Sequence, residues 1–347
     1  MEVRLINLQV YVLMMKLDNK CNEVIEFTKK LCEKLRNGEI LSSTEAAFTV
    51  LDVLVRASEV CKTHYNEYLI VWLPKILRSR PTSQLLINSL RQFLHQYIHI
   101  ARCKGLDEAL SNVKGIVQSI KEGIDKEVAL IALIGSRRII DGDVILTHSF
   151  SKTLIEVFRR ARDEGIKFSV YVTESRPIGE GLITASTLAK LGIKTTLIID
   201  SAVRYVMKRV TKVFIGADAI ATNGAVVNKI GTSAIALAAK ESRVRVYVTS
   251  STRKFSFETV FGELVEGLVL NNPDAIIPKE WLNKLSSRVR TKAPLFDVTP
   301  PEYIDAIITE VGLLAPQAIP ILIKEVYGWP PKIIDINELI NEVRDLD

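Results

Sequence analysis

The sequence predicts an α/β protein in which a helical N-terminal domain precedes a domain built on a mostly parallel sheet. Before about residue 135, apolar residues recur at spacings of three and four, as at Val24, Phe27, Leu31 and Leu35, which is the period of an amphipathic helix. Beyond it, short apolar runs alternate with helical patterns, and such alternation is typical of parallel sheets with crossover connections. We expect a helical domain at 1–130, a sheet domain at 131–335 and a C-terminal tail at 336–347.

One long helix is predicted at the end of the helical region. An apolar stripe runs from 106 to 132, which would span roughly 40 Å at ~1.5 Å per residue. Asp107 and Glu108 fall in its first turn, where carboxylates interact favourably with the helix dipole. A helix of this length could brace one domain against another.

The predicted sheet has its strand ends lined with polar residues. In parallel sheets ligands bind beyond the carboxyl ends of the strands. His148 and Ser149, Glu174, Asp200 and Asp218 all follow such strands, so we expect a site there. The expected strands are 144–147, 168–173, 196–199, 213–216, 244–248 and a candidate sixth at 307–309; the expected helices are 151–163, 181–191, 202–209 and 232–241.

The composition indicates a globular protein with a small basic excess. Hydrophobic residues make up 48% and charged residues 25% of the 347 residues, which leaves enough apolar surface for a core and excludes disorder as the main state. The formal charge of +6, from 46 basic and 40 acidic side chains, is scattered along the chain. A nucleic-acid module concentrates its basic residues on one face, so we interpret the scattered excess as a solubilising surface. A phosphorylated small ligand also fits this modest basic balance.

The cysteines carry no metal or redox spacing. They are Cys21, Cys32, Cys61 and Cys103, and no pair has the short spacing of a zinc or redox motif. We interpret them as buried, reduced thiols in a reducing compartment. The apolar segment at 6–15 is too short to span a bilayer, and residues 1–14 are interpreted as an extended translation start. These observations predict a cytoplasmic protein without a membrane partner.

Lys229 lies in a segment with the features of an anion site. The Asn223-Gly224 pair marks a turn, and Lys229 precedes a Gly231-Thr232 pair that can open a helix. This order places an ammonium group and free backbone N–H groups close together. The alternative is a hairpin with an exposed lysine.

Two carboxylates follow strands and are candidates for proton transfer or for structural roles. Asp218 comes at a strand end beside small residues, where it could act as an acid or base or serve as a turn or cap residue. Glu174 and Arg176 flank Ser175 before Pro177. They could face a cleft or form an ion pair that holds the loop.

A metal site is not expected. His95 and His99 are four residues apart and could share a metal ion, but no third ligand is evident, so we interpret them as a helix-surface pair. We also expect no cofactor.

Several motifs follow one another along the chain. They are Asp141 to His148 (DGDVILTH), Thr173 to Pro177 (TESRP), Ile215 to Asp218 (IGAD), Asn223-Gly224, Asn228 to Thr232 (NKIGT), Lys254-Phe255 and Phe296 to Pro301 (FDVTPP). With these motifs in this order, the chain over about residues 75 to 330 resembles one family. That family contains the alpha, beta and delta subunits of initiation factor 2B, methylthioribose-1-phosphate isomerase and archaeal ribose-1,5-bisphosphate isomerase.

The resemblance implies a Rossmann-like sheet domain after the helical domain, with a sugar-phosphate pocket between them. In the isomerases a cysteine follows the Thr-His of the first strand and works with the aspartate of Gly-Ala-Asp. The aspartate corresponds to Asp218, and the cysteine position is occupied by Ser149. The other pocket residues that the resemblance implies are Arg80, Ser151, Lys152, Asn228, Lys229 and Lys254.

A second departure from the isomerases lies upstream, where their substrate-gripping Arg-Gly-Ala corresponds to Leu41-Ser42-Ser43. A serine hydroxyl is a far weaker acid than a thiol and needs a base. His148 is unsuited to that role, because neighbouring side chains in a strand point to opposite faces. The sequence therefore favours a non-catalytic regulatory protein of the initiation factor 2B type that binds a phosphorylated sugar or nucleotide.

The alternative is an aldose–ketose sugar-1-phosphate isomerase without the cysteine. Under either hypothesis we expect a homodimer or larger homo-oligomer, formed through the apolar C-terminal segment around Val311 to Ile323. Initiation factor 2 is a candidate partner.

Overall fold

The computed structural model describes residues 21–256, 269–270, 276–281, 284–286, 288–327 and 334–346. The chain forms two compact units, Met1–Asp125 with Lys332–Asp347, and Lys126–Pro331. The boundary lies inside one helix, α6 (Leu106–Ser136), a few residues before the expected position. The segment expected to be a separate tail joins the first unit, and the start expected at 1–14 lies outside the described residues.

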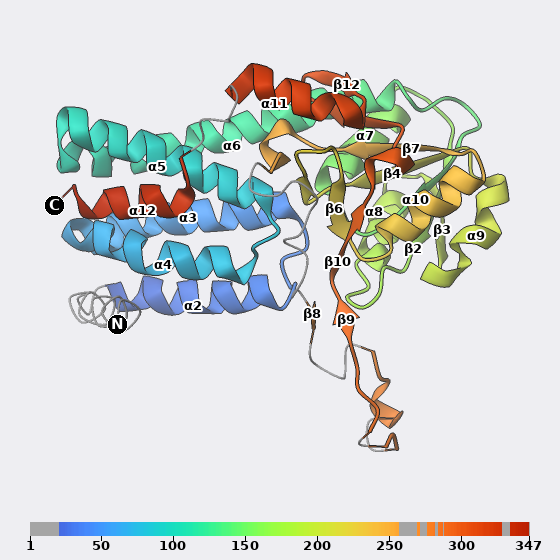
Figure 1. The fold of residues 1–347 in the computed structure, drawn as a ribbon, viewed down its shortest axis with the longest axis horizontal. Helices are drawn as coiled ribbons and strands as arrows, with labels where there is room; N and C mark the ends of the chain where they lie inside the picture. Colours follow the sequence, from blue (N-terminus) through green and yellow to red (C-terminus); the bar gives the residue numbers. More distant parts are fainter. Residues whose placement is uncertain are drawn as a thin grey trace. The chain divides into compact units, whose positions relative to one another are not determined.

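The first unit is helical, as predicted (Figure 1). Ser42 caps α3, since its hydroxyl accepts the N–H of Glu45 at 3.0 Å, a bond that satisfies a donor left free at the helix start. Val24, Leu31 and Leu35 are buried, whereas Phe27 is 42% exposed and does not belong to the core. The helices are α2 (Asn22–Arg36), α3 (Ser43–Cys61), α4 (Tyr65–Ser79), α5 (Gln84–Lys104), the first part of α6 and α12 (Ile336–Arg344).

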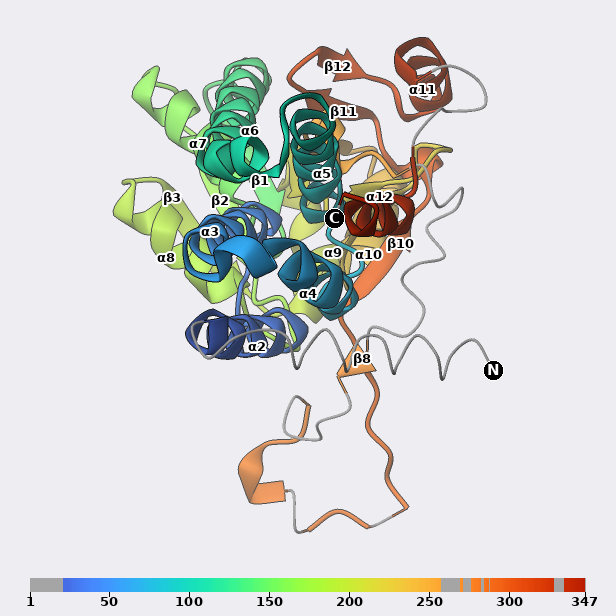
Figure 2. The same ribbon diagram turned by 90° about the vertical axis from the view of Figure 1, so that its left-hand side faces the viewer.

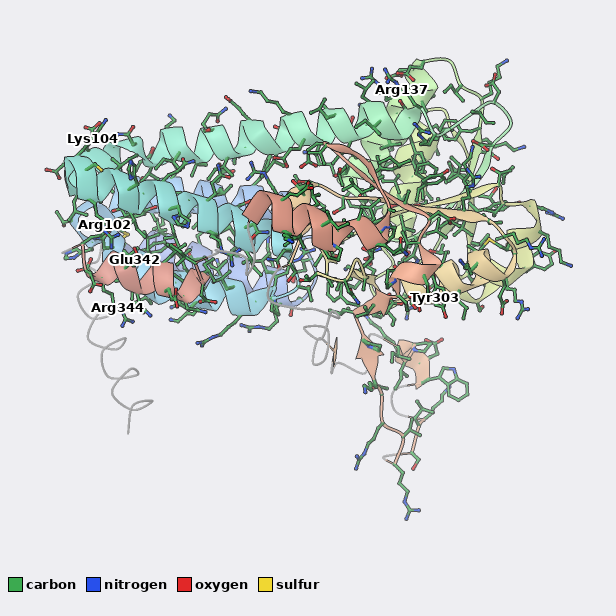
Figure 3. All side chains as sticks on the ribbon, turned by 45° about the horizontal axis from the view of Figure 1, so that its top comes forward. Arg102, Lys104, Arg137, Tyr303, Glu342 and Arg344 are labelled. Carbon is green, nitrogen blue, oxygen red and sulfur yellow. A yellow bond between two sulfur atoms is a disulfide. The ribbon has the colours of Figure 1, made fainter. Side chains whose placement is uncertain are left out.

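The C-terminal helix α12 belongs to this helical unit because of its apolar face. Ile336, Leu339, Ile340 and Val343 are buried at the spacing of one helix face, and α12 packs against α4 and α5 (Figure 2). At the edge of this contact the guanidinium of Arg102 on α5 lies 3.0 Å from the carboxylate of Glu342 (Figure 3).

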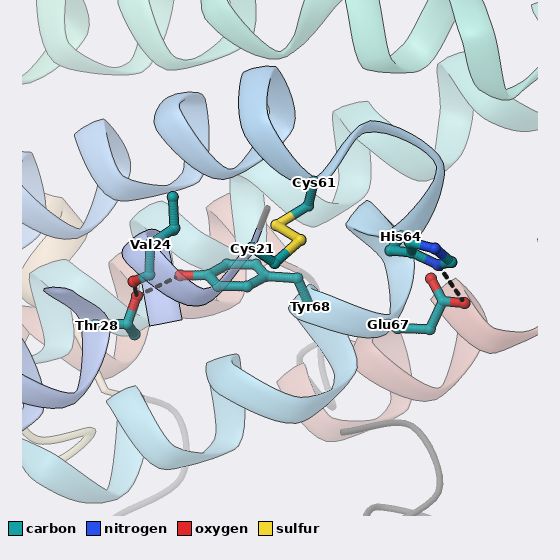
Figure 4. The surroundings of a disulfide bond; sticks show 7 residues. All are labelled: Cys21, Val24, Thr28, Cys61, His64, Glu67 and Tyr68. Carbon is teal, nitrogen blue, oxygen red and sulfur yellow. Dashed lines mark hydrogen bonds and ion pairs between the residues drawn. A yellow bond between two sulfur atoms is a disulfide. The ribbon is translucent and has the colours of Figure 1, made fainter. Parts of the chain in front are cut away.

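The interpretation of the cysteines as four buried, reduced thiols is wrong. Cys21 and Cys61 form a disulfide (Figure 4), Cys32 is buried and Cys103 is exposed. Cys21 precedes α2 and Cys61 ends α3, and the packing of these helices brings the two Cα atoms to 5.2 Å. A separation of 40 residues has no pattern from which this pairing could be predicted.

The second unit contains the predicted, mostly parallel sheet. The strands lie in the order β12-β11-β7-β4-β1-β2-β3. Among the described strands of this sheet, only β12, paired with β11, is antiparallel. The strands are β1 (Val144–Thr147), β2 (Ser169–Thr173), β3 (Lys194–Ile198), β4 (Lys212–Gly216), β7 (Arg245–Thr249), β11 (Ala306–Thr309) and β12 (Gly312–Leu314).

Helices cover both faces of this sheet because its strands are apolar on both sides. In β1, Ile145 faces one buried cluster and Leu146 the other, and in β4 Phe214 and Ile215 divide in the same way. One face packs against the end of α6, α7 (Lys152–Asp163) and α8 (Gly181–Lys190). The other packs against α9 (Val203–Val206), α10 (Thr232–Glu241) and α11 (Ile319–Tyr327). The helix expected at 202–209 is one turn of α-helix between two short 3-10 turns.

Two small antiparallel sheets complete the described part of this unit. One contains β10 (Phe296–Thr299), β6 (Val226–Lys229) and β5 (Ala219–Ile220) in that order, and the other pairs β8 (Val269–Leu270) with β9 (Ala293–Pro294). Gly224 has φ +86° in the turn predicted from Asn223-Gly224, and its Cα is so close to the Pro316 carbonyl that a Cβ would lie 2.3 Å from the oxygen. Glycine is therefore required there.

The described helices include none long and apolar enough to cross a membrane. Among the same residues, no cluster of His, Cys, Asp and Glu is suited to bind a metal ion. In this part of the chain His99 is adjacent to Cys103, with ring nitrogens 4.0 Å from the sulfur.

Candidate functional site

The strand order reverses between β1 and β4, and the loops after these two strands are in close contact. From β1 the chain continues outward to β2 and β3, and from β4 it continues the other way to β7 and β11. A ligand crevice is expected at such a switch point. A Cβ on Gly216, at the end of β4, would lie 2.9 Å from the side chain of Ser151, so glycine allows the loop that follows β1 to approach β4.

Ser149 follows β1 directly and is fixed by three hydrogen bonds. Its φ of +65° is uncommon for a residue with a side chain. Its N–H donates to the Ser175 hydroxyl at 2.8 Å, and its carbonyl accepts the Thr184 hydroxyl at 2.6 Å. Its own hydroxyl donates to Oε1 of Glu180 at 3.0 Å. Ser149 is therefore held in place, with a carboxylate as its side-chain partner.

Glu180 and Lys229 form a buried ion pair beside Ser149. Their side chains are 3% and 9% exposed, and Nζ of Lys229 lies 3.0 Å from the same Oε1 that accepts the serine proton. The ammonium group also lies 5.2 Å from the ring centre of Phe296, a favourable cation–π distance. Lys229 is thus buried at the end of β6, and the alternative of an exposed hairpin lysine is excluded.

Both ring nitrogens of His148 are hydrogen-bonded to groups other than Ser149. Its Nε2 donates to the carbonyl of Ile230 at 2.8 Å, and its Nδ1 lies 2.6 Å from the hydroxyl of Thr173. Burial lowers the pKa of His148, which favours the neutral ring, in which Nδ1 accepts the threonine proton. This arrangement agrees with the expectation that His148 does not act as the base for Ser149.

Asp218 follows β4, and Lys254 reaches the residue before it. Asp218 is buried, and its N–H donates to the carbonyl of Val227 at 2.9 Å. Nζ of Lys254, from the turn after β7, donates to the carbonyl of Ala217 at 2.7 Å. The buried Lys254 therefore links the ends of β4 and β7 beside the backbone of Asp218.

The start of α10 is occupied by a carboxylate of the protein itself. Oδ2 of Asp297 accepts the N–H groups of Gly231 and Ser233 at 2.8 and 3.1 Å. The N–H of Gly231, which was expected to be free for an anion, is therefore bonded to Asp297. Burial raises the pKa of Asp297 to about 6, against the effect of these two bonds. Nearby, the Asn228 amide donates to Thr232 at 3.0 Å.

The remaining predicted residues lie in two places. Ser151 caps α7 by accepting the N–H of Leu154 at 3.3 Å, and Lys152 is the first residue of that helix. Arg80 belongs to the helical unit, where its guanidinium donates to the carbonyls of Ile40 and Leu41 at 2.6 and 3.2 Å. Arg80 therefore binds the segment that precedes Ser42-Ser43, and its contact with a ligand stays a prediction.

The loop from Glu174 to Pro177 is held by Asp200, which follows β3. The carboxylate of Asp200 accepts the N–H groups of Ser175 and Arg176, each at 2.8 Å. These two bonds fix the backbone of the loop, and a cleft-facing role of Glu174 and Arg176 stays a prediction.

Glu180 and Asp297 were not among the predicted site residues. Glu180 lies between two glycines, and a Cβ on Gly181 would lie 1.8 Å from the Thr173 carbonyl. This Gly-Glu-Gly sequence is a signal of close backbone approach. Asp297 lies in the FDVTPP motif, but its partners are 64 and 66 residues away, so the sequence does not indicate its role.

Comparison with known proteins agrees with the fold and with the order of the motifs. The family model described as the initiation factor 2 subunit family matches residues 36–316. The chain belongs to this family. The resemblance inferred from the motifs is thus confirmed.

Within the family, curated relatives of high identity are isomerases. The ribose 1,5-bisphosphate isomerase of Pyrococcus furiosus is 42% identical over 308 residues, covering 86% of this chain and 94% of the relative. The ribose 1,5-bisphosphate isomerase of Thermococcus kodakarensis is 41% identical over 320 residues, covering 89% and 97%. Translation initiation factor eIF-2B of Pyrococcus horikoshii OT3 has a similar structure, with a TM-score of 0.71 and 27% identity over 84% of this chain and 98% of that one.

These relatives contradict the preferred hypothesis of a non-catalytic regulatory protein and favour the alternative of an isomerase. The hypothesis rested on a serine without a base and on Leu41-Ser42-Ser43 at the place of the isomerases' Arg-Gly-Ala. In the folded chain the Ser149 hydroxyl has a carboxylate partner, Glu180, from an element 31 residues away.

Proposed function

We propose that this chain is a sugar-phosphate isomerase that converts ribose 1,5-bisphosphate to the corresponding ketose bisphosphate. The observation that carries the proposal is the 42% identity to a ribose 1,5-bisphosphate isomerase over 94% of that protein. The buried polar groups at the ends of β1 and β4 support it, because they supply the two kinds of group that the reaction needs.

The reaction requires one proton acceptor and one proton donor. The bond between C1 and the ring oxygen O4 breaks, the hydrogen on C2 moves to C1, and C2 becomes a carbonyl. The C2 hydroxyl thereby loses a proton and O4 gains one, so atoms and charge balance. Groups that transfer these protons within hydrogen-bond reach typically contribute ~100- to 10,000-fold each.

Asp218 is the proposed acceptor and Ser149 the proposed donor. A carboxylate at the end of a strand, such as that of Asp218, can accept the proton of the C2 hydroxyl. Ser149 is held by bonds on its N–H, carbonyl and hydroxyl, so its oxygen can be aligned with O4. The start of α7 at Ser151 and Lys152 suits a phosphate group, since helix N-termini bind anions. Asn228 and Lys254 are further proposed contacts of the two phosphates.

The test is turnover of ribose 1,5-bisphosphate by the purified protein, measured as ketose bisphosphate formed. We expect turnover in the wild type and a ~100- to 10,000-fold lower kcat in Asp218→Asn. Asp163→Asn, an exposed aspartate on α7, is the matched control and should keep full activity. A wild-type protein with no turnover would refute the isomerase, and an active Asp218→Asn would refute the role of Asp218.

We also propose self-association through the C-terminal part of the second unit. Val311 and Ile321 are 62% and 60% exposed, and Leu313 is 42% exposed. Exposed apolar side chains of this size are typical of interaction surfaces, and a symmetric homodimer is the commonest oligomer. Light scattering should give at least twice the 38.8 kDa chain mass, and Ile321→Glu should lower it. A single 38.8 kDa species in the wild type would disprove the proposal.

Binding to initiation factor 2 stays a prediction.

A further inference from the structure

Ser149, Glu180 and Lys229 form a continuous chain of buried polar groups. The serine hydroxyl and the lysine ammonium group both lie 3.0 Å from the same carboxylate oxygen, Oε1 of Glu180. The three residues come from the end of β1, the residue before α8 and the end of β6. All three are less than a tenth exposed, so the chain is shielded from bulk water.

A buried ion pair of this kind is a poor device for stability alone. Removing two charges from water costs about as much as their attraction returns. The Glu180–Lys229 pair is moreover bonded to the Ser149 hydroxyl through Oε1 of Glu180. Buried charged groups that converge on a polar group beside a candidate site are candidates for functional residues.

The chemistry of serine explains why the pair is placed there. A thiol can release its own proton near neutral pH, whereas a serine hydroxyl cannot. The related isomerases have a cysteine at this position, according to the resemblance set out above. The neighbouring imidazole cannot help, because both nitrogens of His148 are bonded to Thr173 and Ile230.

We propose that Lys229 and Glu180 resupply the proton that Ser149 gives to the ring oxygen, so that a serine can work in place of a thiol. This inference rests on the proposed isomerase function. Glu180 and Lys229 are positioning residues in this scheme, because they act on the substrate through Ser149.

The transfer is balanced at each bond. As the C1–O4 bond breaks, the Ser149 hydroxyl turns from Oε1 of Glu180 toward O4 and gives O4 its proton. Nζ of Lys229 gives a proton to Oε1 of Glu180, and Oε1 passes it to Oγ of Ser149. Lys229 ends neutral and Glu180 remains a carboxylate. Asp218 holds the proton from the C2 hydroxyl, and exchange with solvent returns one proton to Lys229 after product release.

The test compares Glu180→Gln with variants that replace the serine. Glutamine keeps the size of the side chain and an oxygen for the serine hydroxyl, but it cannot pass a proton. We expect kcat to fall ~100- to 10,000-fold with KM within about threefold. Adding Ser149→Cys to Glu180→Gln should raise kcat at least ~10-fold, since a thiol supplies its own proton. Glu164→Gln, on the surface at the end of α7, is the control and should have wild-type kcat.

A second pair of variants guards against a folding defect. Glu180→Gln leaves the Lys229 charge unpaired, so Lys229→Met with Glu180→Gln is measured as well. This double variant removes both charges and should be folded by circular dichroism, yet as slow as Glu180→Gln. Wild-type activity in either variant would overturn the relay. A failure of Ser149→Cys to raise the activity of Glu180→Gln would show that Glu180 only supports the fold, and would overturn it too.

A measurement without substrate separates the relay from the isomerase function. The thiol introduced by Ser149→Cys is alkylated with iodoacetamide across pH, with and without Glu180→Gln. Loss of the neighbouring carboxylate should lower the apparent pKa of this thiol by about one unit. An unchanged alkylation profile would overturn the contact between residue 149 and Glu180, whatever the activity.

The turnover measurements separate the two proposals. No turnover in the wild type or in any variant would refute the isomerase function and the relay together. An active wild type with an equally active Glu180→Gln would refute the relay alone.

Discussion

Two buried serines of the helical unit and two of the sheet unit are satisfied in different ways. In the helical unit, Ser89 and Ser79 each donate to the backbone carbonyl four residues earlier, at 2.6 and 2.8 Å. In the sheet unit, Ser149 donates to Glu180, 31 residues away, and Ser251 donates to Glu127, 124 residues away. A bond within one turn exists wherever the helix exists, whereas a bond to a distant carboxylate needs the whole tertiary arrangement.

The difference indicates where removal of a side chain should matter. Replacing a serine whose hydroxyl bonds within its own helix removes one hydrogen bond and leaves the helix intact. Replacing a residue of the Ser149–Glu180–Lys229 network can leave a charged side chain buried without its partner. The second kind of change lowers the free energy of unfolding several times more. The three predictions below test this contrast.

The largest effect on stability is expected for Lys229→Met. It leaves the buried Glu180 carboxylate without its ion-pair partner, a change that typically costs ~3–5 kcal/mol. Lys229→Met combined with Glu180→Gln removes both charges and should regain most of this loss. Denaturant unfolding of the two variants measures the difference. Equal midpoints for the single and the double variant would show that the pair contributes no such coupling.

A smaller effect, dependent on pH, is expected at Asp297. Burial raises the pKa of Asp297 from 3.8 to about 6, so the folded state holds this proton more tightly than the unfolded state. The resulting stability is fully present below pH 3.8 and is lost as the pH rises through about 6. The loss amounts to about 3 kcal/mol at most, at ~1.4 kcal/mol per pKa unit.

Asp297→Asn isolates this effect because asparagine keeps an oxygen for the N–H groups of Gly231 and Ser233. We expect the stability of the wild type relative to the variant to fall between about pH 4 and pH 7, followed by melting temperatures across that range. A difference that is constant with pH would argue that Asp297 titrates alike in both states.

The smallest effect is expected for Ser89→Ala in α5. Ser89 is fully buried, but its hydroxyl donates only to the Leu85 carbonyl, which the helix already engages. We expect a change of about 1 kcal/mol or less in the free energy of unfolding, and no change in activity. A loss as large as that of Lys229→Met would remove the contrast between the two units.

The sequence by itself determined the class of fold and the edge of the sheet at which a site is expected. Short apolar runs between helical patterns placed strands at β1, β2, β3, β4, β7 and β11, because such runs are a local feature of the chain. The motifs around Ser149, Asp218 and Lys229 indicated the family by the same local reasoning. Residue type also showed that Ser149 needs a partner.

Only the tertiary structure determined which residues contact one another. Glu180 bonds to Ser149 and Lys229, and Asp297 accepts an N–H group at the start of α10. Cys21 forms a disulfide with Cys61, and α12 packs in the helical unit. Each of these contacts joins segments far apart in the chain, and no spacing in the sequence records it. Burial then strengthens the interactions between the charged groups, since a poorly solvated site screens them less than water does. The sequence therefore shows a serine, Ser149, at the position that the resemblance assigns to a cysteine. Only the fold brings a carboxylate and an ammonium group next to it.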